Sequence, residues 1–177
     1  MSKLLAGIVV GAVSLLGMAA LNEHAPLALA GPNALRDDPS PLARNDIPPH
    51  YRTLYTSAAH RCPQLPWSVL AGIGKVESDH GRSTAPGVHK GANHAGARGP
   101  MQFLPATFAH YGVDGDHDGR TTPYDPADAI PSAARLLCAE GAHDGTLPGI
   151  KTALYAYNHA GWYVDQTLNW AVRYTSS

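Results

Sequence analysis

The chain has 177 residues, of which 44% are hydrophobic and 15% charged, and its formal net charge is −1 at pH 7. That length is typical of one domain, and the near-neutral charge excludes a protein held to nucleic acid by a basic surface. The apolar fraction, together with 3 Trp and 8 Tyr, also excludes a disordered low-complexity chain. Glutamate is rare, because it occurs only at Glu23, Glu77 and Glu140.

The chain starts with an apolar run. Residues 4–21 carry no charge and follow Lys3, which is typical of a signal peptide or a short membrane anchor. Ala28-Leu29-Ala30 provides a cleavage pattern. We therefore assign residues 1–30 to a signal peptide or membrane anchor, with a buried core helix as the alternative. The remainder is expected outside the cytoplasmic membrane, either secreted or in the cell envelope.

Prolines dominate the next segment. Five of them occur in residues 31–50, among polar residues and without helical spacing. Residues 31–48 are predicted to be a Pro-rich linker, and the folded domain is expected over residues 49–177.

The rest of the sequence predicts an all-α domain. Apolar spacing and stop signals predict helices over about 51–62, 66–78, 105–111, 128–140, 148–158 and 162–174. Residues 79–98 show no period, so they predict a long loop. No alternation typical of β-strands extends over a useful length.

Two cysteines, Cys62 and Cys138, occur in the part expected to be exported. A disulfide is the favoured interpretation in an oxidising compartment, and two buried free thiols are the alternative.

Glu77 stands out at the end of the predicted helix 66–78. It follows Leu70 and Ile73 along the apolar stripe of that helix. Burial and the negative end of the helix dipole both raise the pKa of such a carboxyl. The pattern therefore predicts a carboxylic acid that is protonated near neutral pH, which is what a general acid needs to protonate a glycosidic oxygen.

The alternative for Glu77 is a local ion pair with Lys75 or Arg82. Asp79 is discounted as a partner carboxylate, because two residues along a helix correspond to a rotation of about 200°.

Three motifs occur in order: Glu77-Ser78-Asp79-His80-Gly81, Gly99-Pro100-Met101-Gln102-Phe103 and Ala156-Tyr157-Asn158. Their combination resembles the lytic transglycosylases, most of all the secreted actinobacterial type of the membrane-bound lytic transglycosylase B branch. The resemblance implies an irregular, lysozyme-like helical domain, related to goose lysozyme, with a substrate cleft and long loops.

The same resemblance implies an activity on peptidoglycan glycan strands. The family cleaves the β-1,4 bond between N-acetylmuramic acid and N-acetylglucosamine and leaves a 1,6-anhydromuramoyl end. Glu77 matches the family's single acid and base, and no cofactor is implied for catalysis. One carboxylate suffices because the muramoyl C6 hydroxyl supplies the nucleophile, whereas ordinary glycosidases need a second carboxylate.

The resemblance also implies a set of residues that bind substrate or support the acid. Gln102 matches a position that binds substrate near the acid, and Tyr157 one that orients the acid or stabilises charge. Asn93 falls near a position where the family has a serine. The full set is Ser78, Asn93, Met101, Gln102, Tyr157 and Asn158, of which Met101 is also a natural packing residue.

A calcium loop is predicted after residue 113. Acidic residues Asp114, Asp116, Asp118 and Asp125 fall at positions 1, 3, 5 and 12 of an EF-hand-like pattern, and Arg120 would offer its carbonyl at position 7. We expect any Ca²⁺ to be structural. A turn rich in Asp and Gly without metal is the alternative.

Several other functions stay open. The ten histidines suggest a zinc peptidase as a further possible function, but the sequence lacks the spacing typical of zinc ligands. The alternatives to a transglycosylase are a goose-type lysozyme that lets water attack, a non-catalytic calcium-stabilised peptidoglycan-binding module, and a helical envelope scaffold. We expect a monomer without nucleic-acid partners, which contacts the membrane only through an uncleaved N-terminus.

Overall fold

The computed structural model describes residues 32–176, and the expected signal peptide or anchor of residues 1–30 lies outside this range. The described part is helical without strands, apart from one isolated bridge between Arg98 and Phe103. The elements are η1 (Pro32–Arg36), α1 (Pro41–Asp46), α2 (Pro49–Ala59), α3 (Trp67–Ser78), α4 (Pro105–Tyr111), α5 (Pro126–Ala139), η2 (Ala142–Asp144), α6 (Leu147–Tyr157) and α7 (Gly161–Thr175). The all-α prediction is confirmed.

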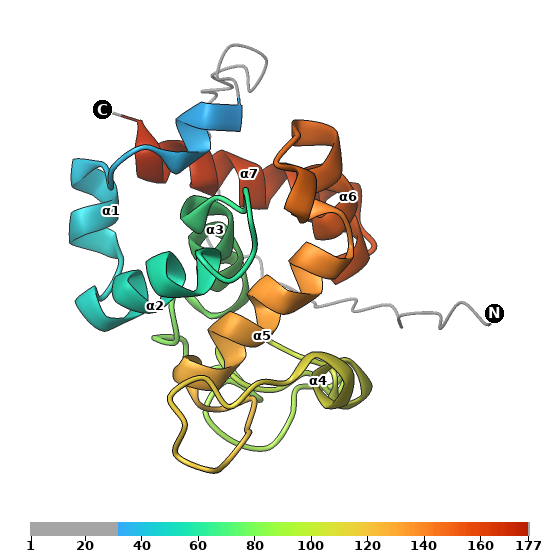
Figure 1. Ribbon diagram of the computed structural model, residues 1–177. Coiled ribbons are helices and arrows are strands. Elements are labelled where there is room, and N and C mark those ends of the chain that lie inside the picture. Colours follow the sequence, from blue (N-terminus) through green and yellow to red (C-terminus); the bar gives the residue numbers. More distant parts are fainter. Residues whose placement is uncertain (1–31, 177) are drawn as a thin grey trace, which may run out of the picture.

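Helix α3 lies at the centre of the fold, surrounded by α7, α2, α5 and η1 (Figure 1). Its sequence explains this place, because Val69, Leu70 and Ile73 are all fully buried and apolar residues are not confined to one face. At Gly72 the backbone of α7 comes so close that a Cβ would lie 2.5 Å from the carbonyl oxygen of Thr167. A glycine is therefore needed where α3 and α7 cross.

A left-handed turn ends α3. Asp79 and His80 have φ angles of 53° and 55°, and the His80 N–H donates to the Gly74 carbonyl at 2.8 Å. This is a Schellman-type ending, which satisfies carbonyls that the last turn would otherwise leave free. Glu77 consequently belongs to the last turn of the central helix.

Residues 32–47, expected as part of a linker, instead belong to the folded domain. Leu35 and Ile47 are at most 3% exposed and lie in the hydrophobic core. Ser40 caps α1 by accepting from the Ala43 N–H at 3.1 Å, and its own N–H donates to the Tyr174 carbonyl at 2.8 Å. The prolines begin the helices, because a proline at the first helical position lacks only an N–H that has no partner there.

The remaining helices agree with the predicted positions to within a few residues. The largest shift is at α2, which ends at Ala59 and not near residue 62. Helix α5 begins at Pro126 because Asp125 caps it, with its side chain accepting from the Ala127 N–H at 2.8 Å. Residues 79–98 form the expected long loop between α3 and the bridge at Arg98.

The predicted disulfide joins Cys62, after α2, to Cys138 near the end of α5, with the two Cα atoms 5.6 Å apart. It ties the segment between α2 and α3 to α5, which packs against both of these helices. In residues 32–176, the helices are all too short or too polar to span a bilayer.

Candidate active site

Glu77 is partly buried at the end of α3. Burial raises the pKa of its carboxyl to about 7, while the Tyr163 hydroxyl acts in the opposite direction. The group therefore keeps a substantial protonated fraction near neutral pH, as its place on an apolar stripe predicts. The Glu77 side chain is neither fully exposed nor fully buried.

The two cations considered as partners of Glu77 pair with other carboxylates. Lys75 Nζ lies 2.9 Å from Asp46 and 2.7 Å from Asp79, and Arg82 reaches the same two carboxylates at 2.9 and 2.7 Å. Burial alone would raise the pKa of Asp46, but hydrogen bonds from Lys75, Tyr174 and Arg82 hold it well below its usual range. Asp79 is thus engaged by the two cations and makes no second carboxylate for Glu77.

Tyr163, in the first turn of α7, is the nearest functional group to Glu77 that sequence reasoning missed. Its side chain is 1% exposed, and its hydroxyl lies close enough to the Glu77 carboxyl for each to shift the pKa of the other. The Tyr157 ring stacks parallel to it, with an interplanar angle of 4° and ring centroids 6.3 Å apart. Tyr157 of α6 and Tyr163 of α7 therefore both lie close to the Glu77 carboxyl.

A buried hydrogen-bond chain centred on His80 fixes the chain directly after Glu77. Tyr55 and Tyr174 lie 3.0 and 2.8 Å from the two ring nitrogens of His80, and the Tyr174 hydroxyl donates to Asp46 at 2.6 Å. Because that hydroxyl has one hydrogen, it must accept from Nε2–H, so Nδ1 accepts from Tyr55. Burial lowers the pKa of His80 to about 4, so the ring is neutral at pH 7.

The loop of residues 98–103 is fastened from two sides. The Ser78 hydroxyl donates to the Pro100 carbonyl at 2.6 Å, and the Tyr157 hydroxyl donates to the Met101 carbonyl at 2.7 Å. Arg98 and Phe103 close the loop with two backbone hydrogen bonds of 2.9 Å. The loop is therefore held to α3 just beyond Glu77 and to α6.

Gln102 of this loop and Asn93 of the preceding long loop, both predicted to bind substrate, lie side by side. Asn93 Nδ2 donates to Gln102 Oε1 at 3.0 Å, and Gln102 Nε2 donates to the Gly99 carbonyl at 2.8 Å. The Asn93 carbonyl oxygen accepts from the backbone of Ala95 and Ala97. Both side chains are partly exposed, so polar groups remain available at the surface.

Two of the predicted binding residues, Ser78 and Met101, have other roles in the structure, and Asn158 is nearly buried. Ser78 is 2% exposed and uses its hydroxyl to accept from the Gly81 N–H and to hold Pro100, and the Met101 side chain is fully buried. Asn158 is 6% exposed and follows α6 as its C-terminal cap. Burial removes the side chains of Ser78 and Met101 from any surface that a sugar could contact, so these two assignments are corrected to loop anchoring and packing.

The acidic loop brings together a different set of carboxylates from the predicted one. Single oxygens of Asp114, Asp116 and Asp128 lie within 4.8 Å of one another. Asp128 is 1% exposed and accepts from the backbone N–H groups of Gly115 and Thr122, both at 2.9 Å. Asp125 caps α5 and lies outside this cluster, in which Asp128 takes its place.

The other two predicted ligands stay on the rim of this loop. Asp118 and Arg120 are both exposed, and the Asp118 carboxylate accepts from the Arg120 N–H at 2.8 Å. Three carboxylates with converging oxygens fit a hard divalent cation such as Ca²⁺.

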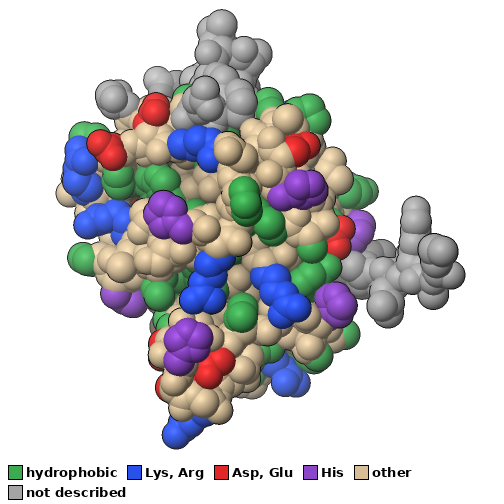
Figure 2. All heavy atoms as spheres, in the orientation of Figure 1, with side chains coloured by type: hydrophobic (Ala, Val, Ile, Leu, Met, Phe, Trp, Pro, Cys, Tyr) green, Lys and Arg blue, Asp and Glu red, His purple; other side chains and the backbone are tan. Residues whose placement is uncertain are grey.

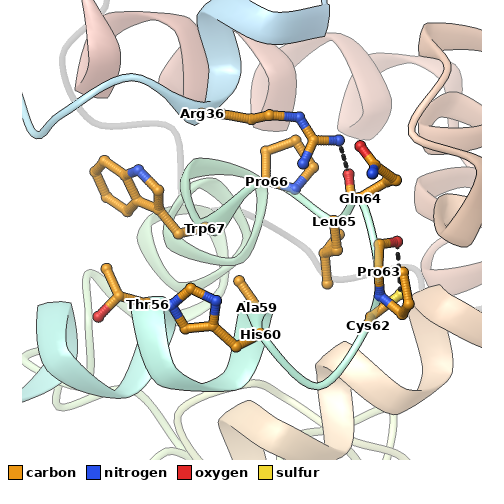
Figure 3. A pocket seen from close by; sticks show the side chains of 10 residues that line it. All are labelled: Arg36, Thr56, Ala59, His60, Cys62, Pro63, Gln64, Leu65, Pro66 and Trp67. Carbon is orange, nitrogen blue, oxygen red and sulfur yellow. Dashed lines mark hydrogen bonds between the residues drawn. The ribbon is translucent and has the colours of Figure 1, made fainter.

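Glu77 lines neither of two hollows on the surface. One of about 270 Å³ lies at the start of α3, where Figure 3 shows the Arg36 guanidinium beside Pro66 and Gln64, whose backbone carbonyl it donates to. Trp67 is ten residues before Glu77, or roughly 15 Å along the helix. The other, of about 370 Å³, is lined by residues of α6 and α7 including Tyr155 and Asp165.

The charged groups form no single-sign surface on the face shown in Figure 2, where basic, acidic and histidine side chains are interspersed. This distribution agrees with the near-neutral net charge.

Comparison with known proteins supports part of this arrangement. Residues 83–160, which include most of the long loop, the acidic loop and Tyr157 but neither Glu77 nor Tyr163, match the family described as Transglycosylase SLT domain. This part of the chain is similar to a transglycosylase SLT domain. The chain is also 45% identical over 47 residues to the membrane-bound lytic murein transglycosylase B of Escherichia coli K12. The resemblance inferred from the three motifs is confirmed.

Solved structures share the fold of this chain. It superposes on the Escherichia coli lytic transglycosylase Slt35 in complex with bulgecin A with a TM-score of 0.59 and 17% identity, covering 75% of this chain and 76% of that one. A structure of Slt35 in complex with calcium gives a TM-score of 0.58, also at 17% identity and with the same coverage. The curated relative is matched over only 13% of its length, or 27% of this chain.

The signals that sequence reasoning missed are spatial. Tyr163 lies six residues beyond Tyr157, outside the three motifs, and only the crossing of α3 and α7 brings it to Glu77. Asp128 lies beyond the twelfth position of the pattern used for the acidic loop. A longer loop pattern that ends within a helix would have included it.

Proposed function

We propose that this chain is a peptidoglycan lytic transglycosylase that cleaves the β-1,4 bond between N-acetylmuramic acid and N-acetylglucosamine. The observation that carries the proposal is the Glu77 carboxyl, partly buried beside Tyr163 with a pKa raised to about 7. A general acid works best when its pKa lies near the working pH. The SLT domain match and the transglycosylase B relative support the same activity.

Glu77 acts first as an acid and then as a base. It donates its proton to the glycosidic oxygen while the bond from C1 to that oxygen breaks, and N-acetylglucosamine leaves with a free hydroxyl. The Glu77 carboxylate then takes the proton from the muramoyl C6 hydroxyl as that oxygen bonds to C1. The 1,6-anhydro ring closes, no water is consumed, and Glu77 ends protonated.

The other residues position the substrate and stabilise the charge on Glu77. Tyr163 can donate to the Glu77 carboxylate formed after the first proton transfer, which stabilises the base until the ring closes. Gln102 and Asn93 present partly exposed amides beside the fastened loop and are suited to bind the acetamido and hydroxyl groups of the glycan. Tyr157 holds this loop against α6.

Mass spectrometry of the fragments released from purified sacculi tests the proposal. A transglycosylase releases 1,6-anhydromuramoyl ends, which are one water lighter than hydrolysed ends. Hydrolysed ends alone would replace the proposal by a goose-type lysozyme, and binding without any release would replace it by a non-catalytic module.

Two matched variants assign the activity to one carboxyl. Glu77→Gln keeps shape and hydrogen-bonding capacity but removes the transferable proton, so fragment release should fall to background. Glu140→Gln changes the other glutamate of the described residues, which is exposed, and should release fragments at the normal rate. Normal release by Glu77→Gln would exclude the mechanism.

We also propose that the acidic loop binds a structural Ca²⁺ through Asp114, Asp116 and Asp128. Their converging oxygens support this, and so does the burial of Asp128 with two backbone N–H donors around it. When bound, the ion would neutralise mutually repelling carboxylates and hold the loop on α5. The proton transfers at Glu77 need no metal.

The expected setting follows from the substrate. We propose that the enzyme acts as a monomer on glycan strands outside the cytoplasmic membrane, where its disulfide can form and persist. Residues 1–30 would serve as its signal peptide or anchor.

A further inference from the structure

Two buried hydroxyls next to Glu77 lack well-formed hydrogen bonds. Tyr163 is 1% exposed and Thr167 is fully buried, and neither hydroxyl has a partner of good geometry. They lie four residues apart on α7, which places them on the same face of the helix. Buried hydroxyls are normally hydrogen-bonded, so such a pair needs an explanation.

The crossing of α3 and α7 places this pair against the catalytic acid. Gly72 packs directly on the backbone of Thr167, because a Cβ there would lie 2.5 Å from the Thr167 carbonyl oxygen. Glu77 follows Gly72 on α3, and Tyr163 precedes Thr167 on α7. The Tyr163 hydroxyl is therefore within interaction range of both the Glu77 carboxyl and the Thr167 hydroxyl.

We propose that Thr167 is a positioning residue that gives the Tyr163 hydroxyl a second acceptor, used while Glu77 is protonated. The inference rests on the proposed role of Glu77 as acid and base. When Glu77 is ionised, the Tyr163 O–H donates to the carboxylate. When Glu77 is protonated, the same O–H turns toward Thr167 Oγ1, which needs only rotation about the phenolic C–O bond.

This arrangement stabilises both states that the reaction needs. A phenol with the carboxylate as its sole acceptor would favour the ionised form and release the proton too early. With Thr167 available, the phenol stays satisfied when the carboxyl holds its proton, so the protonated form is also stabilised.

The two hydroxyls should then act on the pKa of Glu77 in opposite directions. Removing the Thr167 hydroxyl leaves the phenol only the carboxylate and lowers the pKa. Removing the Tyr163 hydroxyl withdraws the donor from the carboxylate and raises the pKa, as expected for a group that favours the charged form. A residue that only packed the two helices together would not produce this pair of opposite shifts.

The other titratable groups around this place stay the same in both variants. Tyr157 packs on Tyr163 from α6 and also interacts with Glu77. Lys75, Asp79 and Arg82 pair with one another or with Asp46, and His80 is held by Tyr55 and Tyr174.

Carbon-13 NMR of the full chain labelled at the glutamate carboxyl carbon measures this pKa directly, since the chain has only three glutamates. The signal absent from Glu77→Gln belongs to Glu77. Thr167→Val, which keeps the shape, should lower the pKa of Glu77 by roughly 0.5 to 1, the change expected for one hydrogen bond. Thr167→Ser should leave it unchanged, and Tyr163→Phe should raise it.

A double variant completes the test. In a Tyr163→Phe background, Thr167→Val should cause no further shift, because its effect passes through the phenol. An unchanged or raised pKa in Thr167→Val, or a shift that persists in the Phe background, would overturn the proposal. Thr167→Ala serves the same measurement should the valine variant not fold. The titration needs no turnover, so a chain that shows these shifts without cleaving glycan would disprove the proposed function and not this inference.

Discussion

The Tyr157 hydroxyl on α6 donates a 2.7 Å hydrogen bond to the backbone carbonyl of Met101. The neighbouring carbonyl of Pro100 accepts from Ser78, one residue after Glu77. One short loop is therefore tied to α3 and to α6 at adjacent peptide groups. The position of Gln102 relative to Glu77 depends on these two bonds.

Tyr157→Phe should loosen this loop without opening the core. The Met101 carbonyl loses its donor, which should lower the free energy of unfolding by about 1–2 kcal/mol. Misplacing Gln102 should lower kcat/KM by about tenfold or more, because small displacements near a reacting bond are costly. Tyr155→Phe is the matched control, because that ring is 49% exposed and should tolerate the change. Equal losses in the two variants would argue against a role for the loop bond.

Fragment release should decline as Glu77 loses its proton. Because burial raises the pKa of this carboxyl to about 7, kcat/KM should fall about tenfold per pH unit above that value. Release of soluble fragments from sacculi between pH 4 and pH 9 measures the profile. A rate that stays level up to pH 9 would mean that another group donates the proton.

Glu77→Gln should stabilise the protein, and more so at high pH. The ordinary pKa of 4.5 is raised to about 7 in the folded state, so the folded state binds more protons than the unfolded state between these values. Stability from the protonated carboxyl is therefore complete below pH 4.5 and lost as the pH rises through 7. The variant avoids this loss, and its advantage should grow from near zero at pH 4 to at most about 3 kcal/mol above pH 7.

Chemical denaturation at several pH values measures this difference, with Glu140→Gln as the control that should show no such trend. A stability difference independent of pH would mean that Glu77 is not held in its neutral form by burial.

Calcium should raise the melting temperature, and the acidic loop should be the cause. A ligand that binds only the folded state at 100 times its Kd stabilises by about 2.7 kcal/mol, which corresponds to several degrees. Asp116→Asn removes an exposed carboxylate of the cluster and should reduce this shift. Asp165→Asn, on the exposed face of α7, should not. Melting temperatures measured in calcium and in a chelator test this prediction. Equal melting temperatures of the unchanged protein under the two conditions would exclude the site.

Removing residues 1–48 should destabilise the domain severely. It deletes η1 and α1, whose Leu35 and Ile47 are buried, and with them the Asp46 carboxylate that receives Lys75, Arg82 and Tyr174. Burial of two such apolar side chains alone contributes several kcal/mol. A chain that starts at residue 32 should melt like the full chain. If a chain starting at residue 49 did so as well, residues 32–48 would be a linker after all.

Helix positions and the raised pKa of Glu77 could be predicted because both follow from local patterns. Apolar residues at helical spacing, with prolines at the starts, place α3 and α6 nearly to the residue. The position of Glu77 on the apolar stripe of its helix predicts the direction of its pKa shift before any neighbour is known.

What could not be predicted depends on packing between distant segments. Tyr163 becomes part of the site only because α7 crosses α3 at Gly72, and one sequence does not reveal which helices cross. Asp125 fits a twelve-residue calcium pattern as well as any residue, but capping α5 uses its side chain and leaves the place to Asp128. Prolines before residue 50 suggest a linker unless the buried partners of α1 are known.

The packing of η1 onto the core limits how far the folded domain can lie from the apolar run of residues 4–21. Because the folded domain already includes Leu35, and η1 begins at Pro32, ten residues (22–31) separate it from the apolar run of residues 4–21. Ten fully extended residues span at most roughly 35 Å. An enzyme still embedded by that run would work only on the innermost layer of the wall, whereas cleavage after Ala30 would free it to diffuse through the full thickness.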